Sequence, residues 1–254
     1  MSIFRQLRAT ASRQDISVPR ELGFALGTEQ YEVPVIFRPA TDGHLCLTGR
    51  PGSGKTVLLR ALAEEAVQVM DVHIADAWAG HSQADGVRVD GAASFASTVE
   101  GCAEMLEAVL AEVRRRVKQC ALEGVSAFDD LAYPPRRILV ILDDTRHLLV
   151  EDEYSPAGDG RPKARSVECI REIVTCARLA GITFVFSSQW ALDQSGISYD
   201  VLGALCSRLE LESTPSWYYT LGMDDSTRSQ PPPRTGIYTS LGAFASTAVE
   251  IESR

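Results

Sequence analysis

The sequence predicts an α/β fold in which helices flank a mainly parallel central sheet. Strand-like apolar runs alternate with helical patterns across most of the 254 residues, as in chains built from strand–helix–strand units. The run ILVIL at 138–142 is continuously apolar and β-branched, which is typical of a parallel strand buried on both faces. A glycine-rich stretch at 49–54 follows another apolar run and precedes a helical one, so a strand and a helix are expected on either side of it.

Residues 1–30 are interpreted as a polar lead-in with at most one short helix, and residues 31–254 as one domain. Apolar runs predict strands at 33–37, 42–48, 71–77, 138–142, 182–188, 204–213 and 235–240. Apolar residues at helical spacing predict helices at 55–69, 97–124 and 167–181.

The ends of two helices carry capping signals. Ser97 followed by Glu100 has the spacing of a capping box, and the helix that it opens is expected to end near Gly124. Gly181 is expected to cap the end of the third helix. Loops are expected at 77–93, with or without a short strand at 87–89, at 126–136, at 154–165, and at the proline-rich connector 229–236.

Composition limits the function classes. The net charge of −9 excludes a globally basic surface, so any contact with DNA needs local basic patches. No apolar run has the length of a membrane span, and the N-terminus lacks the apolar core of a secretory signal, so a cytoplasmic protein with no membrane span is expected. The six cysteines form no C-x-x-C pair and are interpreted as reduced, and the four histidines show no metal-ligand spacing.

The glycine-rich loop fits a phosphate-binding motif. Gly49, Gly54, Lys55 and Thr56 match G-x-x-x-x-G-K-[ST] between a strand and a helix. Backbone N–H groups of such a loop turn around phosphate oxygens, and the helix N-terminus adds its positive end. Lys55 is expected to reach the β- and γ-phosphates of ATP, and Thr56 to offer its hydroxyl to Mg²⁺. The expected nucleotide-binding residues are Gly49, Arg50, Pro51, Gly52, Ser53, Gly54, Lys55, Thr56 and Val57.

Two further strand ends supply polar side chains. Asp143 ends a buried strand and is expected to hold Mg²⁺, and Asp144 stands where a catalytic base for the attacking water would lie. The alternative is an ordinary acidic turn, because strands often end in such residues. Gln189 follows the next strand and either hydrogen-bonds the γ-phosphate or the water, or faces solvent as a loop glutamine.

The order of these segments resembles a known family. LGTEQYEVPVIFRPATDGHLCLTGRPGSGKTVLLRAL, MLEAVLAEVRRRVKQCALEGVSAFDDL, ILVILDD and IVTCARLAGITFVFSSQ follow one another as in the motor domain of FtsK/SpoIIIE-type translocases and their conjugative and type VII secretion relatives. The resemblance covers roughly residues 22–254. It implies a RecA-like P-loop core that assembles as a ring, usually a hexamer, with ATP at the subunit junctions.

The resemblance also implies roles for single residues. Gln189 becomes a γ-phosphate sensor, and Arg208 or Arg178 could act near the nucleotide of a neighbouring subunit; the alternative for each arginine is an ordinary surface or packing role. The chain departs from the family at Asp144, where the family has glutamate. Aspartate is one methylene shorter, and a base placed about 1 Å too far from its water can cost on the order of 100-fold in rate. Trp190 follows Gln189 where the family often has arginine, and no DNA-orienting module is expected.

Three functions remain open at this point. The first is a minimal DNA translocase of a conjugative or mobile-element type. The second is a secretion-type ATPase that engages a protein partner, and the third is a weakly hydrolysing subunit in which ATP acts as an assembly switch. Basic candidates for DNA contact, each with a solvated surface as the alternative, are Arg114, Arg115, Arg116 and Lys118 on the long helix, and Arg161, Lys163 and Arg165 on the loop before the third helix.

Overall fold

The computed structural model describes residues 22–28, 33–76, 79, 86–151, 155, 158, 160–190, 195–197, 201, 207–211, 235–239 and 246–250. Most of the predicted lead-in and of the proline-rich connector lies outside these residues, as do Cys206 and Ala191.

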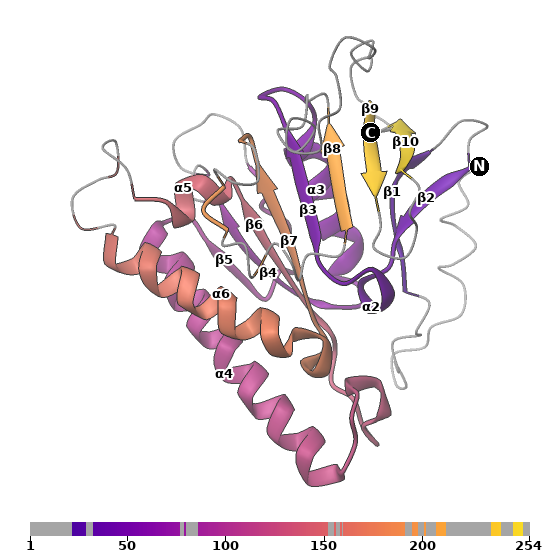
Figure 1. Ribbon diagram of the computed structural model, residues 1–254, viewed down its shortest axis with the longest axis vertical. Coiled ribbons are helices and arrows are strands. Elements are labelled where there is room, and N and C mark those ends of the chain that lie inside the picture. Colours follow the sequence, from indigo (N-terminus) through magenta and orange to yellow (C-terminus); the bar gives the residue numbers. More distant parts are fainter. Residues whose placement is uncertain are drawn as a thin grey trace, which may run out of the picture.

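The described strands form one ten-stranded sheet in the order β2-β1-β10-β9-β8-β3-β7-β6-β4-β5 (Figure 1). The strands are β1 Phe24–Thr28, β2 Pro34–Phe37, β3 Leu45–Gly49, β4 Asp71–Asp76, β5 Ser94–Ala96, β6 Ile138–Asp143, β7 Ile182–Ser188, β8 Ser207–Leu211, β9 Thr235–Thr239 and β10 Ser246–Glu250. Every neighbouring pair from β8 through β3, β7, β6 and β4 to β5 is parallel. The predicted parallel sheet is therefore confirmed for the half that carries the glycine-rich loop.

The other half of the sheet is antiparallel, and it includes two strands that the sequence analysis did not predict. Residues 24–28, assigned to the lead-in, form β1, which pairs antiparallel with both β2 and β10. The expectation of a polar lead-in through residue 30 is wrong at these residues, because Phe24 and Leu26 point into the core at 2% and 1% exposure. β10 was also missed, and it joins β9 to β1.

The helices are α2 Pro39–Asp42, α3 Lys55–Ala66, α4 Val99–Glu123, α5 Thr145–Leu149 and α6 Gly160–Ala180, with a 3₁₀ turn η1 at Phe128–Asp130. α4 ends at Gly124 (φ 69°) as predicted, but its N-cap is Thr98, whose Oγ1 accepts a hydrogen bond from the Gly101 amide, and not Ser97. The short edge strand is β5 and not residues 87–89. α6 begins at Gly160, so the end of the predicted loop 154–165 is helical.

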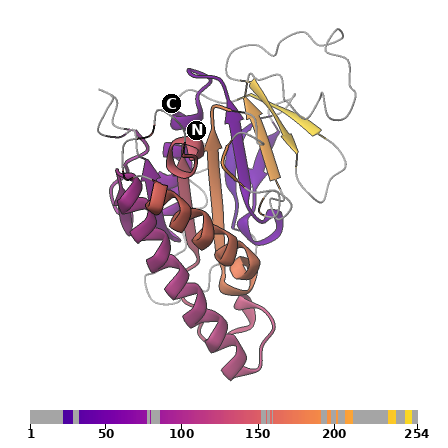
Figure 2. The same cartoon turned by 60° about the vertical axis from the view of Figure 1, so that its left-hand side comes forward.

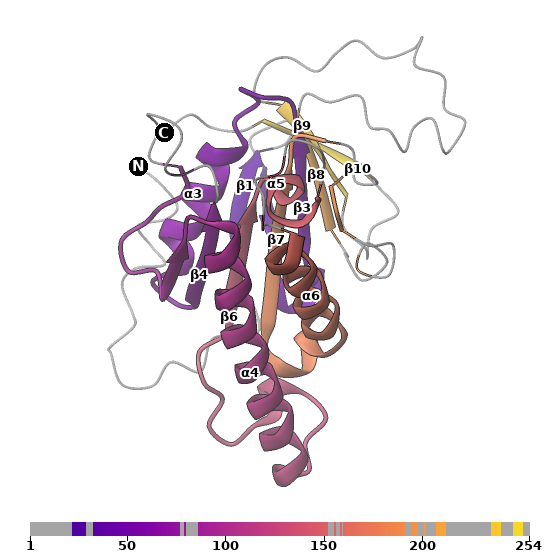
Figure 3. The ribbon, with the colours of Figure 1, turned by 90° about the vertical axis from the view of Figure 1, so that its left-hand side faces the viewer.

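Helices cover both faces of the sheet. One apolar core lies between the sheet and α4, α5 and α6, and the other lies between the sheet and α3. Figure 3 shows α3 and α6 on opposite sides of the strands, and Figure 2 shows α4 and α6 side by side on one face. The carboxyl ends of the parallel strands lie at one edge of this half of the sheet, and their amino ends lie at the opposite edge.

Candidate nucleotide site

Strand direction brings the predicted site together. β3, β6 and β7 are parallel neighbours, so the loops that follow them meet at one edge of the sheet. The glycine-rich loop follows β3 and leads directly into α3, while Asp143 ends β6 and Gln189 follows β7. The predicted loop, aspartates and glutamine therefore lie at the same edge.

Glycine permits the conformation of the loop. Gly52 and Gly54 have φ of 81° and 99°, which L side chains rarely adopt, and a Cβ at either position would project into open space. Gly49 is buried, and a Cβ there would overlap Ser53 Oγ and the carbonyl of Leu211. The loop thus exposes bare backbone on its outer side, where Arg50, Pro51 and Gly52 are exposed. The first N–H groups of α3 have no partners within the helix and are free to meet phosphate oxygens.

Lys55 is folded back over the loop. Its Nζ donates to the carbonyl oxygens of Gly49 and Arg50 at 2.6 and 3.0 Å, and the residue is 8% exposed. Burial lowers the pKa of Lys55, while the charges of Asp143 and Asp144 act in the opposite direction. A cation held only by carbonyls beside a positive helix end is well suited to receive a phosphate.

The remaining loop residues also fit a triphosphate. Ser53 is 1% exposed and its hydroxyl has no hydrogen-bond partner, so a buried donor is left for a ligand oxygen. Thr56 lies half-buried in the first turn of α3, and the side chain of Val57 is 53% exposed.

Asp143 is held by two hydrogen bonds. The hydroxyl of Ser187, on β7, and the amide of Asp144 at 3.1 Å both donate to its Oδ1. Burial is the largest cause that raises the pKa of Asp143 to about 6, and the nearby charges of Asp76 and Asp144 raise it further against the lowering effects of Ser187 and Lys55. A buried carboxylate surrounded by other acids favours a cation. Carboxylate and hydroxyl oxygens are ligands that Mg²⁺ prefers, so Asp143 and Thr56 fit this metal.

Asp144 adopts a strained backbone conformation. Its φ of 51° makes it the one described residue other than glycine with a positive φ, and it forms the N-cap position of α5. Gln189 Nε2 donates to Asp144 Oδ2 at 3.2 Å. Gln189 is exposed to solvent and also contacts the expected base, so its role toward the γ-phosphate or the water stays a prediction.

Arg146 and Trp190, which lie close to Asp144 and Gln189 in the sequence, are also in contact. The guanidinium of Arg146 lies 4.9 Å from the centre of the Trp190 ring, a cation–π distance. Trp190 therefore ties the end of β7 to α5, at a position where the resembling family often has arginine.

Two residues near Asp143 were not singled out from the sequence. Ser187 is its hydrogen-bond donor, and Asp76 is its register partner at the end of β4. Asp76 is 3% exposed and its Oδ2 accepts the Val87 amide at 3.1 Å. The sequence pattern that could have identified Asp76 is the one that identified Asp143: both are the acidic last residue of an apolar strand.

The two arginines suggested by resemblance lie elsewhere in this chain. Arg208 is on β8 in register with Cys46 of β3, three residues before Leu211, which pairs with Gly49. Arg178 is exposed in the last turn of α6, near the amino ends of the parallel strands. Neither joins the polar residues of the nucleotide site within one subunit, so an action in a neighbouring subunit stays a prediction for both.

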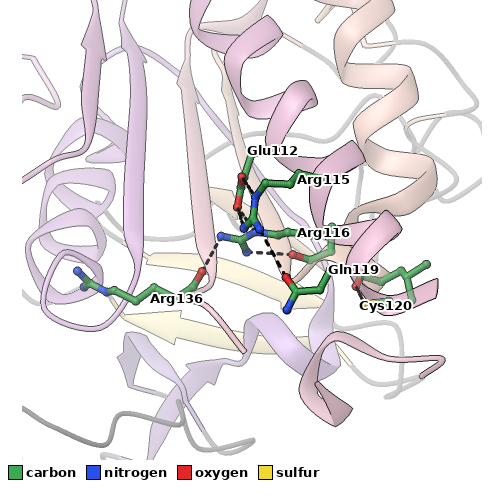
Figure 4. A network of polar contacts seen from close by, with 8 residues as sticks. Glu112, Arg115, Arg116, Gln119, Cys120 and Arg136 are labelled. Atoms are coloured by element: carbon green, nitrogen blue, oxygen red, sulfur yellow. Dashed lines mark hydrogen bonds and ion pairs between the residues drawn. The ribbon is translucent and has the colours of Figure 1, made fainter. Parts of the chain in front are cut away.

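The predicted basic cluster on α4 is largely neutralised. Arg114 pairs with Glu172 of α6 at 2.8 Å, and Arg115 pairs with Glu112 at 2.7 Å. Arg116 is 2% exposed and also contacts Glu112, at 2.6 Å (Figure 4). Burial rules out a contact between Arg116 and DNA, whereas Arg114 and Arg115 are exposed in surface ion pairs and their contact with DNA stays a prediction.

In the second predicted basic cluster, Lys163 and Arg165 are also engaged by neighbouring groups. Arg165 pairs with Glu100 and Glu107 of α4 at 2.6 and 2.8 Å. Lys163 is buried, and its Nζ donates to the carbonyl of Val150 at 2.8 Å. These side chains bind α6 to its surroundings.

Lys118 and Arg161 are the members of the two predicted clusters that remain exposed and unengaged in the described part of the chain.

The described helices include none that is both long and apolar enough to cross a membrane. No group of three or more His, Cys, Asp or Glu side chains that could hold a metal occurs among the described residues.

A parallel sheet with a glycine loop, a buried lysine and an acidic neighbouring strand end defines a P-loop ATPase. The chain belongs to the AAA domain family, whose model matches residues 38–194. The match spans the glycine-rich loop, both aspartates and Gln189. No curated protein sequence matches the chain.

Solved structures share the fold at low sequence identity. The pCW3 conjugation coupling protein TcpA, in its monomer form with ATPγS, has a TM-score of 0.74 and 14% identity, over 94% of this chain and 68% of that chain. Thermomonospora curvata EccC (ATPases 2 and 3), in complex with a signal sequence peptide, has a TM-score of 0.65 and 12% identity, over 93% and 41%. EssC (ATPases 2 and 3) from Geobacillus thermodenitrificans has a TM-score of 0.63 and 16% identity, over 94% and 46%.

This chain thus spans less than half the length of the EccC and EssC chains. The resemblance to conjugative and type VII secretion motors is confirmed at the level of the fold.

Proposed function

We propose that the chain is an Mg²⁺-dependent ATPase subunit of an FtsK/SpoIIIE-like motor that works as a ring in the cytoplasm. The observation that carries this proposal is the convergence of Lys55, Asp143 and the Asp144–Gln189 pair at one sheet edge. Lys55 would leave its carbonyl partners and bind the β- and γ-phosphates. Asp143 and Thr56 would hold Mg²⁺, which neutralises charge on the phosphates during transfer.

Asp144 and Gln189 would act on the attacking water. Gln189 occupies one oxygen of Asp144, so the amide holds the carboxylate in one orientation. Because Asp144 is shorter than the family glutamate, hydrolysis is expected to be slow. Slow turnover suits a motor stimulated by its substrate, and it also suits a subunit in which bound ATP controls assembly.

DNA is the first candidate substrate. Support comes from the fold shared with a conjugation coupling protein over most of this chain. A hexameric ring would bring a neighbouring subunit to each nucleotide, and Arg208 or Arg178 could then act in trans. On α4, Arg116 is buried, so DNA contact there would rest on the exposed Arg114, Arg115 and Lys118.

A protein partner is the second candidate. The observation that favours it is the engagement of Arg114, Arg115 and Arg165 with acidic neighbours, which leaves little free positive charge on a chain of net charge −9. EccC, whose structure contains a signal sequence peptide, shares the fold.

The decisive experiment measures ATPase rate and native mass together, with Mg²⁺ and with or without duplex DNA at low salt. A DNA-stimulated rate that falls as salt rises supports the translocase. Stimulation only by a protein captured in the presence of ATP supports the second candidate. A rate identical in the Lys55→Ala variant would refute the ATPase itself.

A further inference from the structure

A cavity lies at the edge of the sheet opposite to the glycine-rich loop. It has a volume of 460 Å³ and lies between α2, η1, the last turns of α6 and the amino ends of the parallel strands. His44 immediately precedes β3, Arg137 precedes β6, and Ile182 begins β7. The cavity belongs to neither the P-loop nor the aspartate cluster, and its volume falls in the range of small-molecule sites.

His44 lines this cavity, and a hydrogen bond holds its ring in place. The residue is 6% exposed, and its Nδ1 accepts the Phe184 amide at 3.0 Å. Because Nδ1 is an acceptor, the neutral ring carries its proton on Nε2. Burial lowers the pKa of His44 to about 4, which keeps the ring neutral at physiological pH. The remaining hydrogen-bonding group of this cavity-lining ring is therefore an N–H donor.

The wall at η1 is held rigidly. The guanidinium groups of Arg116 and Arg137 each lie 5.3 Å from the centre of the Phe128 ring. Arg137 Nη2 is 2.6 Å from both carboxylate oxygens of Asp129. A Cβ at Gly181 would overlap the Phe128 ring, so the aromatic wall packs directly on backbone. A preformed wall reduces the cost of ordering a ligand.

The charge of the lining is positive once internal pairs are removed. Asp129 and Arg137 neutralise each other, while Arg178 lines the cavity, is exposed, and has no partner among the described residues. Val174, Ile182 and Phe128 make the rest of the surface largely apolar.

We propose that this cavity binds a ligand with an apolar body and one carboxylate, which accepts from Nε2 of His44 and faces the guanidinium of Arg178. The apolar body packs against Phe128, Val174 and Ile182. Such a group occurs in a small organic acid and at the C-terminus of a peptide. The site is independent of the nucleotide site and does not rest on the proposed motor function.

Calorimetric titration of the full chain tests the proposed carboxylate site with two acids. N-acetyl-leucine mimics a peptide C-terminus, and 4-phenylbutyrate is a simple organic acid. Each acid is compared with its primary amide. We expect at least one of the acids to bind. Its amide should bind at least about tenfold more weakly, because the amide lacks the charge that strengthens the hydrogen bond. Which acid binds more tightly identifies the source of the ligand.

Three variants locate the binding. Arg178→Ala, at an exposed position, is expected to weaken binding about tenfold or more, whereas Lys118→Ala, an exposed cation on α4, leaves it unchanged. Lys55→Ala also leaves it unchanged, which separates this site from the nucleotide site. Equal binding of acids and amides, no heat at millimolar acid, or an unchanged affinity in Arg178→Ala would overturn the proposal.

Discussion

Gln189 Nε2 donates a hydrogen bond to Asp144 Oδ2 across 3.2 Å, joining the end of β7 to the turn after β6. Among the residues that the structure describes, Asp144 alone combines a side chain with a positive φ. Strain of this kind persists where the surroundings fix it, and here an amide and the start of α5 do so. The expected base is therefore positioned by its neighbours, but its reach is that of an aspartate.

Replacing Asp144 by glutamate is expected to raise kcat. The longer side chain restores the reach of the family residue, and a correction of about 1 Å can be worth up to about 100-fold. Single-turnover hydrolysis with saturating Mg·ATP measures the change. Asp144→Asn, which keeps the shape and removes the base, should fall below the parent. A rate in Asp144→Glu equal to that of the parent would show that side-chain length does not limit hydrolysis.

Replacing Lys55 by alanine is expected to weaken Mg·ATP binding by at least about 100-fold, since a buried charge-assisted contact to phosphate is lost. Fluorescence titration with a labelled nucleotide measures it. Lys118→Ala serves as the matched control, because it removes an exposed cation with no contacts. Equal affinity of the Lys55 variant and the parent would refute the phosphate site.

Replacing Asp143 by asparagine should separate stability from binding. The pKa of Asp143 is raised from 3.8 to about 6, so its ionisation opposes folding above pH 6, and acidification from pH 6 to 4 removes this cost. One pKa unit corresponds to about 1.4 kcal/mol, so the variant gains at most about 3 kcal/mol above pH 6 and nothing near pH 4.

Urea unfolding of the nucleotide-free protein at several pH values measures this gain, with isothermal titration for Mg·ATP alongside. The variant should bind Mg·ATP more weakly while unfolding at higher urea. A variant that is less stable than the parent at pH 8 would contradict the assigned burial cost.

Replacing Gly86 by alanine should disturb the proposed Mg²⁺ site indirectly. Gly86 has a φ of 57°, and a Cβ there would overlap Oδ2 of Asp76, the register partner of Asp143. Arg60 of α3 also donates to the Gly86 carbonyl, with Nε at 3.2 Å. Gly124→Ala is the control, because φ is 69° there but a Cβ meets open space.

The control should lose only the backbone cost of about 1 kcal/mol. Gly86→Ala should lose more and should also weaken Mg²⁺-dependent ATP binding, as followed by thermal unfolding with and without Mg·ATP. Equal losses in the two variants, with Mg·ATP stabilising both fully, would contradict the link to Asp76.

Replacing Arg116 by methionine should cost about 3 kcal/mol of stability. Its guanidinium donates to the carbonyls of Ala180 and Arg136 at 3.0 and 2.9 Å, and the Ala180 carbonyl would be left buried without this donor. Arg114→Ala, which breaks an exposed ion pair, should cost less than about 1 kcal/mol. Urea denaturation distinguishes the two; equal small losses would show that the buried arginine is not structural.

The local parts of the site could be predicted from sequence, and the distant contacts could not. The loop at Gly49–Thr56 and the strand ending at Asp143 each carry their signal within a few residues. The role of Arg116 depends on Ala180 and Arg136, which lie far along the chain, so its charge looked free. β1 (FALGT) and β10 (STAVE) contain no apolar run longer than three residues, and the pairing of one with the other joins distant parts of the chain, so no local pattern distinguished them from connecting segments.

The strand order has a consequence for the time course of folding. β3, which carries the glycine-rich loop, pairs with β7 and β8, whose residues are made more than 130 positions later. The outer hairpin of β1 and β2 likewise waits for β10. Contacts of such long sequence separation form slowly, so a nascent chain must extend past Leu211 before β3 can have both of its neighbouring strands.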